Sequence, residues 1–107
     1  MIEITYHRSY NRVTIKGHAM SNEPGRDLVC AAASALAYTL AANVANLEAN
    51  GQVTEAIVKL EAGDAEISCR PNRKYTAMVS RIFEAVCVGF ELLARDHGLF
   101  VSYKIYG

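Results

Sequence analysis

A histidine and a cysteine in the first third of the chain have side chains that could carry out nucleophilic catalysis together. His18 follows a short segment of alternating apolar residues, and Cys30 comes twelve positions later, near the predicted start of a helix. The thiolate is the attacking species, and an unperturbed cysteine is only slightly ionised near neutral pH. A neighbouring imidazole can accept the thiol proton and later protonate a leaving amine. These residue types therefore suit acyl transfer through a cysteine.

The position of Cys30 in its helix predicts further assistance. Asp27 is a good N-cap residue, because its carboxylate accepts a hydrogen bond from a free backbone N–H group of the first turn. With Asp27 as the cap, Cys30 occupies the third helical position, where the helix dipole favours negative charge. The free N–H groups could also bind the oxyanion of a tetrahedral intermediate. A cysteine in an alanine-rich helix is also a common core residue, so the pair alone does not identify an enzyme.

Two hairpins are predicted from alternating apolar and polar residues. The first covers residues 2–17 and has a polar turn at residues 9–12. The second covers residues 55–70 and is closed by Gly63 and Asp64. The first hairpin ends directly before His18, so it must position the imidazole.

Helical spacing of apolar residues predicts two helices and leaves room for a last strand. The helices cover residues 27–49 and 75–93, and a strand follows at residues 99–105. The predicted order is β-β-α-β-β-α-β. It indicates one domain over residues 1–107, of the α+β or mixed α/β class, in which two helices pack on a mostly antiparallel sheet.

Composition is typical of a globular, core-forming chain. Of 107 residues, 51% are hydrophobic and 21% are charged, which excludes a disordered protein. Basic and acidic residues number 11 each, so we expect no direct nucleic-acid binding. We expect no apolar run as long as the roughly 18 to 20 residues that span a bilayer, and therefore no membrane partner. The N-terminal residues lack the pattern of a secretory signal, and we expect a cytoplasmic protein with reduced thiols.

The remaining cysteines and histidines do not indicate a metal centre. The three cysteines and three histidines show no CxxC or HxxxH spacing, so we expect no zinc and no other cofactor. Cys69 and Cys87 lie on apolar faces of predicted elements and should pack in the core. A thiol redox protein is a weaker alternative, because no resolving cysteine lies near Cys30.

The segment from residue 17 to residue 34 resembles the signature of a known family. It reads Gly-His-Ala at 17–19 and, after a short loop, Gly-x-Asp-Leu-Val-Cys-Ala-Ala-x-Ser at 25–34. This two-sided motif is similar to that of the bacterial ribosomal-processing cysteine proteases, the Prp family. The chain length and the predicted order of elements also resemble that family. The resemblance implies a homodimeric cysteine endopeptidase that removes a short N-terminal extension from a large-subunit ribosomal protein of the bL27 type.

The resemblance also implies roles for individual residues. Cys30 corresponds to the nucleophile and His18 to the general base. The loop that includes Gly17, Ala19 and Gly25 is expected to order around the substrate.

The resemblance implies supporting roles for two further residues of the motif. Two alternative roles remain open for each of them. Asp27 matches the acidic position before the nucleophile, where it would cap the helix or orient His18. Ser34 matches the hydroxyl one turn after the nucleophile, where it would hydrogen-bond to the backbone or pack beside the site.

Because of the alanine-rich run at residues 35–43, the identity of the substrate stays open. It is richer in alanine than we expect of host-encoded members of the family. Similar proteins also occur in prophage-like settings, so processing of a phage structural protein is one alternative. A non-catalytic binding module with the same fold, associated with ribosomes or capsids, is the alternative from another class. The same alanine-rich helix could form the dimer interface.

Overall fold

Five strands in the described part of the chain form one mixed sheet, with two α-helices on one face. The computed structural model describes residues 1–18 and 26–107. The elements in chain order are β1 (Ile2–His7), β2 (Arg12–Lys16), α1 (Arg26–Ala49), β3 (Val53–Glu61), β4 (Asp64–Pro71), α2 (Thr76–Asp96) and β5 (Val101–Tyr106). The order β-β-α-β-β-α-β confirms the predicted α+β fold.

The strands lie in the order β3-β4-β2-β1-β5 across the sheet. At its centre, Ile4 of β1 lies opposite Ile15 of the antiparallel β2 and opposite Tyr103 of the parallel β5. β4 pairs in the antiparallel direction with both β2 and β3. The sheet is therefore mostly antiparallel, as predicted, and β3 and β5 are its edges.

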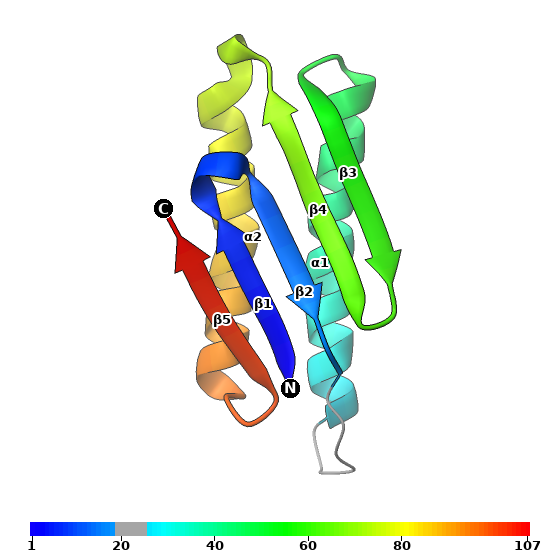
Figure 1. Cartoon of the computed structure of the whole chain (residues 1–107), viewed down its shortest axis with the longest axis vertical. Coiled ribbons are helices and arrows are strands. Elements are labelled where there is room, and N and C mark those ends of the chain that lie inside the picture. The colour runs from blue at the N-terminus through cyan, green and yellow to red at the C-terminus, as the bar shows by residue number, and fades with distance from the viewer. Residues whose placement is uncertain (19–25) are drawn as a thin grey trace.

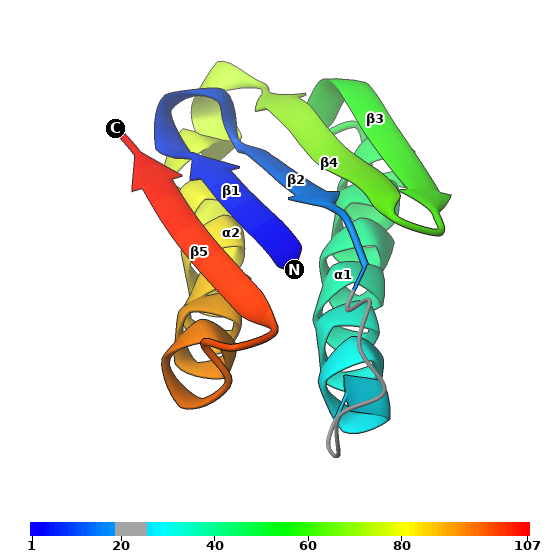
Figure 2. The ribbon, with the colours of Figure 1, turned by 60° about the horizontal axis from the view of Figure 1, so that its bottom comes forward.

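Both helices cover the same face of the sheet, as Figures 1 and 2 show. Ile2, Ile4 and Tyr6 of β1 are buried toward the helices, whereas the residues between them are more exposed. The opposite face carries charged side chains in ion pairs, such as Arg12 with Glu66, whose Nε and Oε2 atoms are 3.2 Å apart. The alternation along each strand thus places the core between the sheet and the two helices.

The apolar stripe predicted for the second helix forms the centre of this core. α2 buries Val79, Phe83, Cys87 and Phe90, which recur at helical spacing on one side. The Phe83 ring stacks with the ring of Tyr6 at a centroid distance of 6.3 Å. The predicted core positions Val79, Phe83 and Phe90 are therefore confirmed, whereas Met78, which was also predicted on the stripe, is exposed.

α1 lies close to α2 because small residues occupy the contact. Ala33 and Ala37 of α1 are buried. Gly89 of α2 lies so near Leu36 that an added Cβ would be 2.7 Å from the Leu36 Cδ2 atom. The missing side chain at Gly89 therefore allows the close approach of the two helices. That the alanines of α1 let another backbone approach this helix stays a prediction.

α1 also corrects the expectation that no segment is apolar enough to span a bilayer. In the described part of the chain, one helix, Asp27–Ala49, is long and apolar enough by length and composition, and 33% of its most apolar window is buried. The expectation was wrong because uncharged polar residues interrupt the run without removing its mean hydropathy. Val29, Leu40 and Val44 on its inner side belong to the core of the sheet and helices.

Candidate active site

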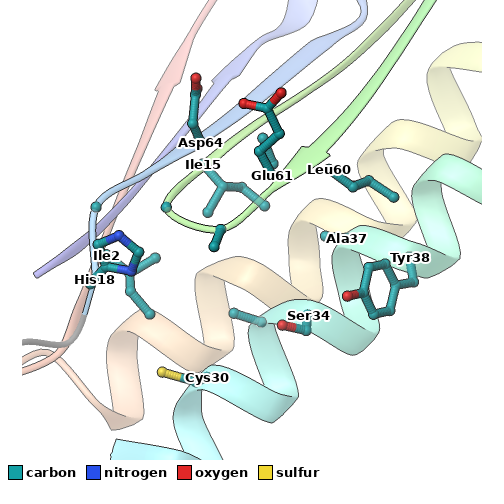
Figure 3. A pocket seen from close by; sticks show the side chains of 15 residues that line it. Ile2, Ile15, His18, Cys30, Ser34, Ala37, Tyr38, Leu60, Glu61 and Asp64 are labelled. Carbon is teal, nitrogen blue, oxygen red and sulfur yellow. The ribbon is translucent and has the colours of Figure 1, made fainter.

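A cleft of about 650 Å³ lies where α1 passes the end of β2 and the turn between β3 and β4 (residues 62–63). His18 and Cys30 both line this cleft, together with Ser34 and Tyr38 (Figure 3). Its other lining side chains are largely small or apolar: Ile2, Ile15, Ala33, Ala37, Leu60, Ala62 and Ala65. The cleft therefore combines one thiol, one imidazole and two hydroxyl groups on an apolar surface.

Cys30 is the fifth residue of α1, which corrects its predicted helical position. α1 begins at Arg26, so Asp27 lies inside the first turn and is not the N-cap residue. The prediction failed because acidic residues are favoured throughout the first turn as well as at the cap. In the α-helical pattern, the N–H group of Cys30 pairs with the carbonyl of residue 26. The free N–H groups therefore lie one turn before the sulfur and not at Cys30 itself.

His18 directly follows β2 and Gly17, and its backbone is held from two sides. The Gly17 N–H group donates to the carbonyl of Gly63 at 3.0 Å. The N-terminal ammonium group of Met1 donates to the His18 carbonyl at 2.7 Å. The His18 side chain remains exposed. The end of the first hairpin thus presents the imidazole to the cleft from the side of the sheet.

The imidazole and the thiol lie on two different walls of the same cleft. Figure 3 shows His18 on the sheet side and Cys30 on α1, with the sulfur pointing toward the histidine side. Within the described residues, no direct hydrogen bond joins the two side chains. Hydrogen bonds between catalytic groups are often long in the absence of substrate and shorten in the complex. The structure thus brings the imidazole and the thiol to one cleft, on walls that belong to different elements.

α1 adds polar groups to the cleft at a regular interval. Cys30, Ser34 and Tyr38 follow one another at four-residue spacing and line the same wall. Ser34, for which a backbone hydrogen bond or packing beside the site was predicted, lines the cleft. Tyr38 was not predicted, although its spacing of two turns from Cys30 is a signal that could have found it.

The other residues of the motif fall in different places. Asp27 is exposed in the first turn of α1. Gly17 lines the cleft and has a φ of +92°, which favours glycine. Ala19 and Gly25 lie outside the described residues, as does the expected ordering of the loop between them.

The turn between β3 and β4 lines the cleft. The sequence predicted only that this turn closes a hairpin. Asp64 accepts hydrogen bonds from Lys16 of β2 and from Lys59 of β3, the latter at 2.6 Å. The hydrogen bond from Lys16, which has the largest effect, and the hydrogen bond from Lys59 lower the pKa of the Asp64 carboxyl to about 2. The ion pairs tie three strands together beside the cleft. No sequence signal showed that this turn would reach His18, because strand pairing across the sheet decides its position.

No metal-binding cluster is found among the described residues, counting groups of three or more His, Cys, Asp and Glu side chains.

A family model described as cysteine protease Prp matches residues 1–102 of the chain. The chain belongs to the cysteine protease Prp family. Comparison with curated proteins finds no match.

Solved structures with the same fold cover nearly the whole of this Prp-family chain. The structure of SMU.848 from Streptococcus mutans has 29% sequence identity and a TM-score of 0.65, covering 97% of this chain and 90% of that chain. The ribosomal processing protease Prp from S. aureus with a covalently linked product peptide has 19% identity and a TM-score of 0.70, covering 99% and 100%. The same protease with a substrate peptide has 18% identity and a TM-score of 0.69, covering 98% and 97%.

The three cysteines of this Prp-family chain differ in their environment. Cys69 and Cys87 are buried in the core, as predicted. Burial raises the pKa of the Cys69 thiol to about 11 and that of the Cys87 thiol to about 12. Both thiols are therefore protonated and shielded near neutral pH. Cys30 is partly exposed and lines the cleft.

Proposed function

We propose that this chain is a ribosomal-processing endopeptidase in which Cys30 is the nucleophile and His18 the general base. The observation that carries the proposal is that the imidazole and the thiol line one open cleft in a chain of the cysteine protease Prp family. The proposed substrate is the N-terminal extension of a large-subunit ribosomal protein of the bL27 type. The compartment in which ribosomal proteins are made, the cytoplasm, is the proposed location.

The access of Cys30 to solvent and the burial of the other two thiols support Cys30 as the nucleophile. A cysteine protease needs a thiol that can become a thiolate and meet a peptide carbonyl. Cys69 and Cys87 fail both requirements, because burial raises their pKa values to about 11 and about 12. Cys30 has an opening to solvent and an imidazole on the facing wall.

The proposed reaction is a two-step acyl transfer. His18 accepts the Cys30 proton, and the thiolate attacks the carbonyl carbon of the scissile peptide bond. The tetrahedral intermediate collapses as the C–N bond breaks, and the His18 imidazolium protonates the departing amine. A water molecule, deprotonated by His18, then attacks the thioester, releases the new carboxylate and restores the thiol. The free N–H groups at the start of α1 are the proposed donors to the oxyanion.

The shape of the cleft supports recognition of an extended peptide. Apolar side chains from the sheet and from α1 form its floor, among them Ile2, Ile15, Leu60 and Ala37. Apolar side chains of a peptide would be removed from water on this floor, and the hydroxyl groups of Ser34 and Tyr38 would pair with peptide polar groups. Selectivity then depends on several residues around the cut, because a thiol and an imidazole alone do not distinguish one peptide from another.

The ribosomal substrate is supported by the likeness to S. aureus Prp. That protein is described as a ribosomal processing protease, and its structures hold product and substrate peptides. Its fold covers 99% of this chain, which includes the whole of the cleft. A phage structural protein would present the same chemistry to the cleft, so the assay below includes both substrates.

A homodimer formed through α1 is the proposed assembly. Six residues at alternating three- and four-residue spacing form the outer stripe of α1, which is exposed: Leu28, Ala31, Ala35, Tyr38, Ala42 and Ala45. Only 33% of the apolar window of this helix is buried, and 69% of Leu28 remains exposed. A second copy of the chain would cover this stripe, and its small side chains allow two helices to approach closely.

The proposed function is tested by incubating the purified protein separately with a tagged ribosomal-protein precursor and with a tagged phage structural protein, and measuring the products by mass spectrometry. We expect one cut that removes the N-terminal extension. Cys30→Ala and His18→Ala should reduce the rate by at least about a hundredfold, because each removes a group that acts in the bond-breaking steps. Cys69→Ala and His7→Ala are the matched controls, since neither residue lines the cleft, and both should retain the cut.

Each alternative gives a different outcome in the same assay. If the phage structural protein is cut and the ribosomal precursor stays intact, the proposed substrate is wrong and the proposed cleavage chemistry still holds. Retention of both precursors as stable complexes without a cut would favour the binding module. Full cleavage by Cys30→Ala would refute the proposed nucleophile.

A further inference from the structure

We infer that Gly63, in the turn between β3 and β4, is a positioning residue for the His18 imidazole. The inference rests on the proposed function, because it assigns Gly63 a role through His18. It goes beyond that function, since it adds an element from the far hairpin to the site. The absence of a side chain at residue 63 creates the space in which the imidazole lies.

The geometry at this turn leaves no room for a methyl group. A Cβ atom added to Gly63 would lie 2.2 Å from Nε2, 2.5 Å from Cε1 and 3.0 Å from Cδ2 of His18. All three distances are at or below the shortest separation that real Cβ atoms show. The ring of His18 therefore lies directly against the backbone of the turn, and its Nε2 atom is the closest to the added Cβ.

The turn is held in place, so the imidazole is the part that must move. The Gly63 carbonyl accepts a hydrogen bond from the Gly17 N–H group at 3.0 Å, directly beside His18. Asp64, the next residue, is paired with Lys16 and Lys59 on the two neighbouring strands. A histidine side chain has only two rotatable bonds, and rotation about them moves the ring away from its present position. An alanine at position 63 should therefore displace the ring.

Displacement of the imidazole should affect the chemical step more than peptide binding. A misplacement of about 1 Å in a catalytic group can cost roughly a hundredfold in rate. The apolar floor and the α1 wall of the cleft are separate from residue 63 and should still bind peptide. Gly63→Ala is therefore expected to lower kcat by roughly a hundredfold, with KM changed by less than about threefold.

Gly51 provides the matched control for backbone strain. It has a φ of +69°, close to the +74° of Gly63, so alanine is strained to a similar degree at both positions. A Cβ atom at Gly51 meets no atom within 4 Å, and the residue lies between α1 and β3, outside the cleft. Gly51→Ala should keep kcat within about twofold of the wild type, because the backbone strain is then the sole change.

The experiment compares the wild type with Gly63→Ala, Gly51→Ala, His18→Ala and the double variant His18→Ala/Gly63→Ala. The first readout is kcat and KM on the peptide cut in the assay above. The second is the pH profile of the rate at which iodoacetamide alkylates Cys30, located by mass spectrometry. The third is the free energy of unfolding in urea. For Gly63→Ala we expect an alkylation profile that moves toward that of His18→Ala, while the profile of Gly51→Ala overlays the wild type.

The double variant keeps the inference testable if Gly63→Ala folds poorly. Removal of the imidazole removes the collision, so Gly63→Ala should destabilise the His18→Ala protein no more than Gly51→Ala destabilises the wild type. Equal fold-changes in kcat on Gly63→Ala with and without His18 would overturn the inference, as would a double variant that does not fold. So would a Gly63→Ala enzyme with the kcat of Gly51→Ala. Loss of the proposed function would instead appear as a His18→Ala enzyme with wild-type kcat.

Discussion

At the scale of single residues, the cleft depends on one accessible thiol among three. Cys30 is partly exposed, whereas Cys69 and Cys87 are buried in the core. The Cys87 thiol is hydrogen-bonded to Tyr103, but the larger effect is burial, which raises its pKa to about 12. The reactivity of the folded chain toward thiol reagents should therefore come from one position.

Native-state alkylation tests this difference between the cysteines. Iodoacetamide at pH 8 should add one label to the folded protein, at Cys30, because the other two thiols are protonated and shielded. In 8 M urea all three cysteines should be labelled, since burial is lost. Intact mass and peptide mapping give the number and the position of the labels. Labelling of Cys69 in the folded protein at a rate equal to that of Cys30 would contradict the burial that the structure shows.

The sequence predicted some residues of the site and missed others for a physical reason. His18 and Cys30 were accessible to sequence reasoning because a histidine after a strand and a cysteine near a helix start carry local signals. Tyr38 shares the helical spacing of Cys30 and could have been added. Gly63 could not, because its contact with His18 depends on how two hairpins pair across the sheet.

At the scale of the elements, the strand order decides which residues meet in the cleft. In the described part of the chain, periodicity predicted the two α-helices and the five strands in the correct order, since alternation and helical spacing are local properties of the chain. It did not predict that β4 lies between β2 and β3, which brings the β3–β4 turn beside the end of β2. It also placed Asp27 at the cap of α1, although the helix begins at Arg26.

The ion pairs that hold the β3–β4 turn give its stability a defined pH dependence. Hydrogen bonds from Lys16 and Lys59 lower the pKa of Asp64 to about 2, below its ordinary value of 3.8. A carboxyl whose pKa is lower in the folded protein stabilises it above the ordinary pKa, and this contribution is lost as the pH falls toward 2. Asp64→Asn should therefore be less stable than the wild type at pH 6, by a small amount because the pairs are exposed.

Urea unfolding between pH 6 and pH 2 measures this dependence. The difference in unfolding midpoint between the wild type and Asp64→Asn should be constant above about pH 4 and should shrink as the pH falls toward 2. Glu91→Gln, on the exposed side of α2, is the control and should show no such convergence. A difference that persists unchanged at pH 2 would show that the Asp64 ion pairs are not its cause.

At the scale of the whole molecule, the two sides of α1 have different surroundings. Its inner side belongs to the core and to the wall of the cleft, and its outer stripe is exposed along the length of the helix. Only 33% of the most apolar window of this helix is buried within the chain. A second copy of the chain is the proposed cover, and Tyr38 would then lie both in the cleft and at the edge of the interface.

The mass of the protein in solution tests this assembly. Light scattering after size-exclusion chromatography should give twice the 11.7 kDa mass of the chain. Ala42→Glu on the outer stripe should give the monomer mass, because it places a charge in an apolar helix contact. Ala85→Glu, on the exposed side of α2, should remain a dimer. A wild-type protein at 11.7 kDa would contradict the proposed interface.

The most direct test of the central claim is to trap the nucleophile with a substrate-like reagent. A peptidyl vinyl sulfone that carries the residues before the mapped cut should form one adduct, and peptide mapping by mass spectrometry should place it on Cys30. The rate of adduct formation should fall by roughly a hundredfold in His18→Ala, because the imidazole no longer accepts the thiol proton. An adduct on any other residue, or an unchanged rate in His18→Ala, would contradict the account.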